Sequence, residues 1–265
     1  MCRLYGVTRG GYYAWRKRGM SPRAQEDHLL SKAIRLIYEQ SHQIYGSPRI
    51  QEVLANVDRK HSRKRIARLM AEQGLEGRCM RIYRAIPGLQ HFFRDIDKQT
   101  LEGATGINQV WVGDVTYLKV GDQWCFLAVV MDWFSRRIIG WSLGNRRTVS
   151  LTLKALNRAV HNRRPQGPVI FHSDRGIEYV GHDFRARIKR LGFIQSINRP
   201  NRMNDNARME SFFGSMKCEW LHGLVFDSND ALRGKIRGYI SFYNYQRLHS
   251  SLDYQSPVTF EEANN

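Results

Sequence analysis

Residues 110–118 read VWVGDVTYL, and this stretch decides which class of fold the sequence can adopt. Its β-branched and aromatic residues predict a strand, which the acidic residue Asp114 interrupts without a local partner. Two further strands are predicted directly after it, in WCFLAVVMDWFS at 124–135 and in RRIIGWSLG at 136–144. The continuous apolar run in the first of these is typical of a central strand. The sequence therefore predicts a sheet that begins with three consecutive strands.

The segments that follow alternate between helical and strand-like patterns. Apolar residues recur at helical spacing over 148–162, with Thr148 as the cap. GPVIFHSDRG at 167–176 predicts a buried strand, HDFRARIKRLG at 182–192 a basic helix and FIQSIN at 193–198 a short strand, before a helix that carries Glu210. This order predicts an α/β fold of the ribonuclease H-like type over residues 108–222, in which parallel strands extend an antiparallel meander and helices cover both faces.

Three acidic residues from distant segments of this predicted core are candidates for one shared site. In such a sheet Asp114 on the first strand and Asp174 at the end of the fourth can be neighbours, and the Glu210 helix must pack across to join them. Three carboxylates would repel one another unless a cation neutralised them, and hard oxygen ligands favour Mg²⁺ or Mn²⁺. Lys217 follows Glu210 two helical turns further along the same face. These residues predict a two-metal site for phosphoryl transfer on nucleic acid.

The composition supports an anionic partner. The chain has 42 Lys+Arg against 24 Asp+Glu and a formal charge of +18. The arginines are spread along the whole chain, which favours nucleic acid over the alternative of a basic protein with no particular ligand.

The four cysteines share no short spacing, which argues against a structural zinc site and favours a reduced, cytoplasmic protein. There is no signal-peptide pattern, and no apolar run approaches the ~18 residues of a membrane helix, so we expect no membrane partner.

The first part of the chain is predicted to be helical. Residues 1–20 predict a basic aromatic helix, which is either the second half of a helix-turn-helix or an ordinary surface helix. Residues 21–84 predict three short helices, the last of which begins at Ser62 and ends near Gly74. The outer face of that last helix is basic, with Arg63, Lys64, Arg65 and Arg68. A helix-turn-helix DNA reader is favoured for residues 21–84, and a small bundle with a solvated charged face is the alternative.

Two further segments complete the predicted organisation. Residues 85–107 lack clear periodicity and predict a linker. Residues 223–265 predict a helical C-terminal extension, in which Tyr243, Arg247 and His249 have no predicted role beyond packing.

Several stretches resemble one family over nearly the whole chain. They are GYYAWRKR at 11–18, YGSPRI at 45–50, the strand around Asp114, FHSDRG at 171–176, DNARMESFFGSMK at 205–217 and YNYQRLHSSLDYQSP at 243–257. With 35 residues between Asp174 and Glu210, and with Lys217, the sequence closely resembles the integrase-like DDE transposases of bacterial insertion sequences. The resemblance is to the second-frame product of the "IS-three" group, which fuses two reading frames.

The resemblance implies an enzyme that cleaves and joins DNA strands with Mg²⁺, for which Mn²⁺ can substitute. Asp114, Asp174 and Glu210 would be catalytic and would hold two ions, and Lys217 would contact a DNA phosphate. The implied partners are double-stranded DNA at the element's ends and at the target, further copies of the chain on that DNA, and the upstream-frame helix-turn-helix protein. The segment NRPNRMNDNA at 198–207 departs from the family pattern because it contains no glycine.

Several residues and functions keep a second interpretation. Asp132, which also ends a strand, is the strongest rival acid, and His172 either orients a ligand or is a satisfied structural histidine. Arg175 is expected to contact a phosphate or form an ion pair, while Asn206 contacts DNA or, as the favoured interpretation, caps the helix. The alternatives for the whole chain are a catalytically inactive DNA-binding regulator and a ribonuclease H-like nuclease.

Overall fold

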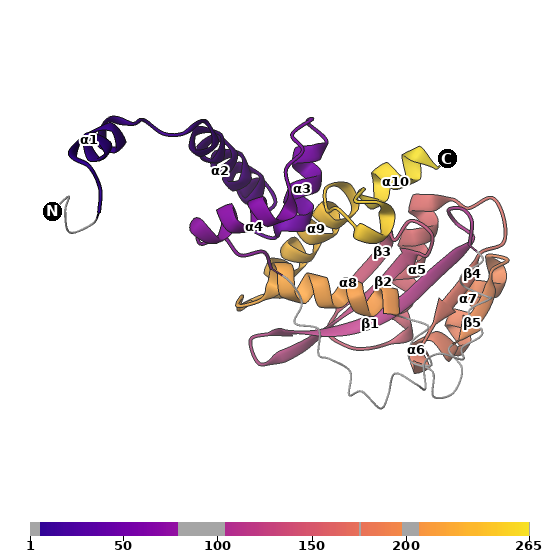
Figure 1. Ribbon diagram of the computed structural model, residues 1–265. Coiled ribbons are helices and arrows are strands. Elements are labelled where there is room, and N and C mark those ends of the chain that lie inside the picture. The colour runs from indigo at the N-terminus through magenta and orange to yellow at the C-terminus, as the bar shows by residue number, and fades with distance from the viewer. Residues whose placement is uncertain (1–5, 79–103, 175, 198–206, 265) are drawn as a thin grey trace, which may run out of the picture. The chain divides into compact units, whose positions relative to one another are not determined.

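The computed structural model describes residues 6–78, 104–174, 176–197 and 207–264. The chain divides into two compact units, Met1–Arg78 and Cys79–Asn265, the first helical and the second built on a sheet (Figure 1). Most of the predicted linker at 85–107 lies outside the described residues. The boundaries that the sequence suggests at residues 20, 84, 107 and 222 stay predictions.

The described part of the first unit contains four helices, α1 Arg9–Lys17, α2 Pro22–Gln40, α3 Ser47–Ala55 and α4 Arg63–Glu72. The hydroxyl groups of Thr8, Ser21 and Ser62 begin α1, α2 and α4 by accepting a hydrogen bond from the backbone N–H three residues later. Helices α2, α3 and α4 contact one another around a buried core that contains Ile34, Ile50, Leu54, Ile66 and Leu69. The sequence predicts three short helices in residues 21–84. Helices α3 and α4 are short, with 9 and 10 residues, but α2 has 19 residues.

The second unit contains a five-stranded sheet in the order β3-β2-β1-β4-β5. Its strands are β1 Val110–Val120, β2 Gln123–Asp132, β3 Ile138–Gly144, β4 Ile170–Ser173 and β5 Ile194–Ile197. The first three strands form the predicted antiparallel meander, and β4 and β5 extend it in parallel from the β1 edge. The predicted neighbours β1 and β4 are therefore paired.

Helices cover both faces of this sheet (Figure 1). α5 Val149–Arg163, the short α6 Ile177–Val180 and α7 His182–Arg190 pack on one face. On the other, α8 Ala207–Met216 contacts β1 and α9 Asn229–Tyr245 contacts β3. A π-helix, Lys217–Leu221, follows α8 directly. In the described part of the chain, no helix combines the length and the apolar character needed to cross a membrane.

Residues 223–264 belong to the same compact unit as the sheet. The Asn244 side chain at the end of α9 bonds both backbone groups of Ile138 in β3, at 2.9 and 2.8 Å. The last elements are a 3₁₀ turn, Ser250–Leu252, and α10 Pro257–Ala263. The buried Glu261 of α10 accepts hydrogen bonds from the side chains of Ser135, Arg137 and Arg163. The C-terminal segment is therefore tied to the sheet by buried polar contacts.

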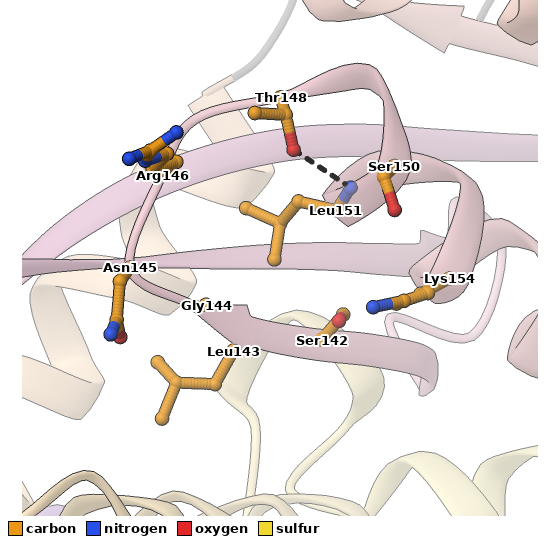
Figure 2. A pocket seen from close by; sticks show the side chains of 9 residues that line it. All are labelled: Ser142, Leu143, Gly144, Asn145, Arg146, Thr148, Ser150, Leu151 and Lys154. Carbon is orange, nitrogen blue, oxygen red and sulfur yellow. Dashed lines mark hydrogen bonds between the residues drawn. The ribbon is translucent and has the colours of Figure 1, made fainter.

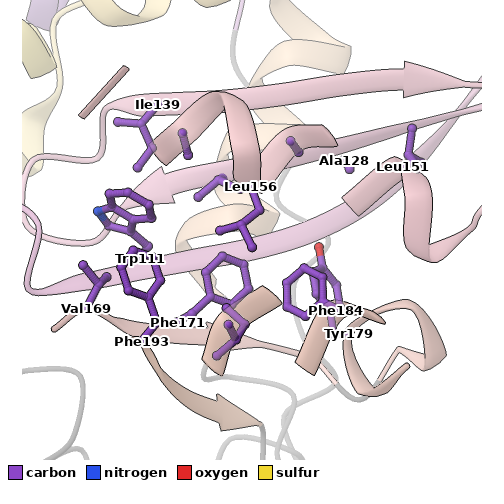
Figure 3. Close-up of a cluster of buried hydrophobic side chains, with 14 residues drawn as sticks. Trp111, Ala128, Ile139, Leu151, Leu156, Val169, Phe171, Tyr179, Phe184 and Phe193 are labelled. Atoms are coloured by element: carbon purple, nitrogen blue, oxygen red, sulfur yellow. The ribbon is translucent and has the colours of Figure 1, made fainter. Parts of the chain in front are cut away.

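The core between the sheet and α5 is aromatic and closely packed. Figure 3 shows Trp111 of β1, Leu156 of α5 and Phe171 of β4 meeting in its centre, with Tyr179 and Phe184 beside them. Since Trp111 faces this core and strand side chains alternate, Val112 and Asp114 face the opposite side of the sheet. That is the side on which α8 contacts β1.

We expect Gly140→Ala to destabilise this core. A Cβ at Gly140 of β3 would lie 2.3 Å from the carbonyl oxygen of Ala155 and 2.7 Å from the amide nitrogen of Ala159, so β3 and α5 would have to separate. The expected loss in the free energy of unfolding is about 1–3 kcal/mol, measured by urea denaturation. The control is Gly234→Ala inside α9, where an added Cβ meets no atom within 4 Å and should be neutral or stabilising. Equal effects at the two positions would contradict the close packing of β3 on α5.

Candidate active site

Asp114 lies in the middle of the central strand β1, half-buried and on the α8 side of the sheet. The backbone N–H of Val115 donates a 2.7 Å hydrogen bond to its Oδ1. Burial, together with the negative charges of Asp174 and Glu210, raises the pKa of the Asp114 carboxyl to about 7, against the lowering effects of the Val115 bond and of Arg147. The negative charge of ionised Asp114 is therefore not fully balanced by nearby positive groups or hydrogen-bond donors, which favours the binding of a cation.

Asp174 follows the last residue of β4. The parallel pairing matches Gly113 with Ser173, so Asp114 and Asp174 each follow one residue of this matched pair, and the charge of Asp174 acts on Asp114. The Asp174 Oδ1 atom accepts a 3.0 Å hydrogen bond from the backbone N–H of Gly176, which fixes the side chain at the strand-to-helix turn. The sheet thus brings together two acids that are 60 positions apart in the sequence.

Glu210 lies in the first turn of α8 and is exposed. Its charge acts on Asp114, so the structure brings all three predicted acids into one neighbourhood. Among the described residues, however, no group of three His, Cys, Asp or Glu side chains is gathered closely enough to hold a metal ion. The donor atoms suit a hard divalent cation, but Glu210 has to approach Asp114 and Asp174 for all three to bind the same ions.

Lys217 is the first residue of the π-helix that follows α8. The sequence pattern predicts that Lys217 lies on the same α-helix as Glu210, whereas that helix ends at Met216 in the structure. The Lys217 Nζ atom lies 4.9 Å from the centre of the Tyr117 ring in β1, and burial lowers the pKa of its ammonium group. Tyr117 therefore holds the lysine against the strand that carries Asp114.

Sequence reasoning missed Arg147, which lies between β3 and α5. Its Nη2 atom is 3.6 Å from the Oδ2 atom of Asp174 and 2.5 Å from the Oε1 atom of Glu178. The Glu178 side chain is just 1% exposed. No local pattern marks either residue, because the two are 31 positions apart.

Asp132 and His172 have structural partners. Asp132 is fully buried and accepts hydrogen bonds from the backbone N–H groups of Asn108, Phe134 and Ser135. Those bonds organise the turn after β2, so Asp132 is accounted for without a metal. His172 is also buried, and its Nδ1 atom lies 2.9 Å from the Ser196 hydroxyl on the adjacent strand. This contact is the one expected of a satisfied structural histidine.

The predicted DNA contacts on α4 divide into two pairs. Arg65 forms ion pairs with Glu26 and Asp27 of α2, at 3.0 and 2.6 Å. Arg68 also pairs with Asp27 and, on its own helix, with Glu72. Arg63 and Lys64 are exposed and take part in no ion pair with the described residues. Arg175 and Asn206, also predicted to contact DNA or cap a helix, lie outside the described residues.

The loop that carries Arg147 also borders a surface pocket of about 280 Å³ (Figure 2). Figure 2 shows Arg146 on this loop and Lys154 of α5 extending toward Ser142. The nine lining residues are Ser142, Leu143, Gly144, Asn145, Arg146, Thr148, Ser150, Leu151 and Lys154. The two consecutive arginines therefore have different surroundings, since Arg146 lines the pocket and Arg147 lies between two carboxylates.

Known protein families match residues in both units of the chain. An HTH-like domain matches residues 24–83, and integrase core domains match residues 104–203 and 210–264. In fold, the chain is similar to a chain of the simian T-cell lymphotropic virus intasome solved with PP2A regulatory subunit B56 gamma. That similarity has a TM-score of 0.51 at 18% identity and covers 60% of this chain and 55% of that one.

Two relatives match along almost the entire sequence. The chain is 38% identical over 266 residues to the insertion element IS600 uncharacterized 31 kDa protein of Shigella sonnei, covering 99% of this chain and 97% of that protein. It is 36% identical over 270 residues to transposase InsF for insertion sequence IS3A of Escherichia coli K12, covering 100% and 93%. Together with the helix-turn-helix-like and integrase core domains, this full-length similarity shows that the chain belongs to the integrase-core transposases of the IS3 family.

Proposed function

We propose that this chain catalyses metal-dependent DNA strand cleavage and strand transfer at the ends of its insertion sequence, as a DDE-type polynucleotidyl transferase. The observation that carries the proposal is the incompletely balanced negative charge of Asp114, which lies beside Asp174 and within electrostatic reach of Glu210. A site with this charge and only oxygen donors is suited to divalent cations.

In this proposal Asp114, Asp174 and Glu210 hold two Mg²⁺ ions, with Mn²⁺ as a substitute. When bound, such ions supply Lewis acidity to the attacking and leaving oxygens of a phosphodiester. Asp114 and Asp174 contribute two carboxylates from neighbouring positions, because β1, which carries Asp114, is paired with β4, which Asp174 follows directly. Glu210 contributes the third carboxylate from the first turn of α8.

The other residues of the site position the DNA. Lys217, held over the Tyr117 ring, would place its ammonium group against a phosphate beside the acids. Water is the nucleophile for cleavage, and the freed 3′-hydroxyl is the nucleophile for joining. The chain therefore needs no nucleophilic side chain of its own.

The test of this function uses labelled duplex DNA that carries the element's own end. Wild-type protein is expected to nick and join this DNA with Mg²⁺ or Mn²⁺ but not with EDTA, and Asp174→Asn is expected to do neither while still binding the DNA. Cleavage that survives Asp174→Asn would contradict the assignment of the acids. If the wild type binds but does not cleave, repeating the assay with the chain fused to its upstream-frame segment separates a missing partner from an inactive site.

We also propose that α4 reads DNA and that only part of its basic face contacts it. Removing Arg63 and Lys64 together is expected to weaken DNA binding and to make the salt dependence, d log K/d log[salt], less negative by about two units. Arg65→Ala is expected instead to lower the stability of the helical unit, because Arg65 pairs with Glu26 and Asp27. Fluorescence anisotropy at several salt concentrations, with urea denaturation in parallel, measures both effects. A larger change of salt slope for Arg65→Ala than for Lys64→Ala would overturn this division.

The proposed assembly follows from the reaction. Joining two element ends requires at least two copies of the chain on double-stranded DNA, at the ends and at the target. The upstream-frame helix-turn-helix protein is the further proposed partner, by fusion or association. We keep residues 21–84 as the proposed DNA-binding domain, 108–222 as the proposed catalytic core and 223–265 as its proposed C-terminal extension.

A further inference from the structure

We propose that Arg147 is a built-in counter-cation of the acidic site: it balances Asp174 until divalent cations bind, and it competes with them for that carboxylate. This inference rests on the proposed function and deepens it, because it assigns a residue that controls how tightly the site takes up metal. It is carried by the contacts of Arg147 with Glu178 and Asp174.

Arg147 is anchored on one side and loosely paired on the other. Its Nε atom donates a 2.6 Å hydrogen bond to Glu178 Oε1, and its Nη2 atom lies 2.5 Å from the same oxygen. The contact between Nη2 and Asp174 Oδ2 is longer, at 3.6 Å. Glu178 can therefore hold the guanidinium in place while the weaker contact with Asp174 is given up.

The anchor itself is fixed within the fold. The Glu178 side chain is 1% exposed, and its backbone carbonyl accepts a 3.2 Å hydrogen bond from the Thr152 hydroxyl of α5. The second carboxylate oxygen of Glu178 is buried and has no hydrogen-bond partner among the described residues. Because a buried carboxylate is costly without a positive partner, Glu178 strongly favours keeping Arg147 beside it.

Gly176 leaves room for the paired side chains of Glu178 and Arg147, which would have to shift if position 176 carried a Cβ. A Cβ at Gly176 would lie 2.4 Å from Glu178 Oε1 and 2.9 Å from Arg147 Nη2. The same glycine donates its backbone N–H to Asp174. Gly176 therefore both orients the Asp174 side chain and lies beside the guanidinium of Arg147.

The charges explain why this contact would be exchanged. Asp114, Asp174 and Glu210 place three negative charges in one neighbourhood, and the positive charge of Arg147 acts on Asp114 as well as on Asp174. A divalent cation bound to Asp174 would repel the guanidinium, since like charges a few ångströms apart interact strongly when partly shielded from water. Arg147 therefore stabilises the acids before metal binds and opposes the binding itself.

The test measures Mn²⁺ binding to the full chain without DNA, by isothermal titration and by electron paramagnetic resonance of free Mn²⁺. Arg147→Gln is expected to bind Mn²⁺ more tightly, by about three- to tenfold, because the competing charge is removed. The matched control is Arg146→Gln, which removes the same charge from the neighbouring position at the pocket and is expected to change the affinity less than about twofold. Unchanged or weaker Mn²⁺ binding in Arg147→Gln overturns the inference.

Two more variants separate competition from structural loosening. Arg147→Lys keeps the charge but loses the two-pronged contact with Glu178, so it is expected to bind Mn²⁺ with an affinity close to that of the wild type. Tighter binding in Arg147→Lys as well would show that a loosened turn, and not the charge, is responsible, and would overturn the inference. Asp174→Asn is expected to lose the binding. A wild type that binds no Mn²⁺ would remove the proposed metal site and this inference with it.

Discussion

Asp114→Asn is expected to lower the rate of DNA strand cleavage by at least about a thousandfold, equivalent to about 4 kcal/mol of transition-state stabilisation. The amide cannot supply the negative charge that the proposed site would need in order to bind divalent cations. Cleavage of element-end DNA under single-turnover conditions measures the effect. The contrasting acid is Asp132, which is buried at the end of β2 and bonded to backbone N–H groups. Asp132→Asn is expected to change stability but not the rate per folded molecule, and the reverse ranking would contradict the site.

The Asp114→Asn variant is expected to remain folded. Burial, followed by the charges of Asp174 and Glu210, raises the pKa of Asp114 from 3.8 to about 7. The folded state therefore binds the proton more strongly than the unfolded chain, and the contribution of Asp114 to stability is lost as the pH rises from about 4 to about 7. At pH 8 in EDTA the asparagine variant should be more stable than the wild type by about 1–3 kcal/mol, with the difference vanishing near pH 4. Urea denaturation at both pH values checks this, and a less stable variant at pH 8 would contradict it.

Arg247→Met is expected to cost about 3–5 kcal/mol of unfolding free energy. Arg247 follows α9, and its Nε and Nη2 atoms donate to the two oxygens of Glu219 at 2.7 and 2.6 Å. The two side chains are only 8% and 5% exposed. Without the guanidinium, the buried Glu219 carboxylate keeps a hydrogen bond from the Tyr239 hydroxyl but loses this positive partner. Urea denaturation followed by tryptophan fluorescence measures the loss.

Two controls isolate the buried charge. The double variant Glu219→Leu with Arg247→Met is expected to recover most of the stability, because a buried ion pair can be replaced by apolar side chains at little cost. Arg233→Met removes an arginine from an exposed pair with Asp230 on the same helix and is expected to change stability by less than about 0.5 kcal/mol. If Arg247→Met costs no more than Arg233→Met, the buried pair does not hold the π-helix to α9.

The parts of the fold that the sequence predicts depend on local patterns. The β-branched and aromatic residues around Asp114 predict the strand β1, and the caps at Ser62 and Thr148 predict where α4 and α5 begin. Each of these signals acts within a few residues of the chain. The pairing of β1 with β4, which makes Asp114 and Asp174 neighbours, then follows from the topology of the fold class.

The contacts that the sequence does not reveal join residues far apart in the chain. Arg65 and Arg68 look like a free basic face on α4, yet Asp27, 38 positions before Arg65, pairs with both. Glu178 looks like an ordinary turn acid until its burial beside Arg147 is seen. No periodicity predicts such pairs, because burial by tertiary packing decides them.

Metal rescue of strand cleavage tests directly whether the acids act on DNA through divalent cations. Element-end DNA with sulfur in place of the leaving 3′-oxygen at the scissile phosphate is cleaved in Mg²⁺ and in Mn²⁺, and the rates are compared with those for ordinary DNA. Sulfur is a poor ligand for Mg²⁺ and a better one for Mn²⁺. If the acids bind the cations, the sulfur substrate is expected to be cleaved slowly in Mg²⁺ and to recover in Mn²⁺, and Asp174→Asn is expected to be inactive under either condition. The same Mn²⁺-to-Mg²⁺ rate ratio for both substrates, or cleavage in EDTA, would contradict this role of the acids.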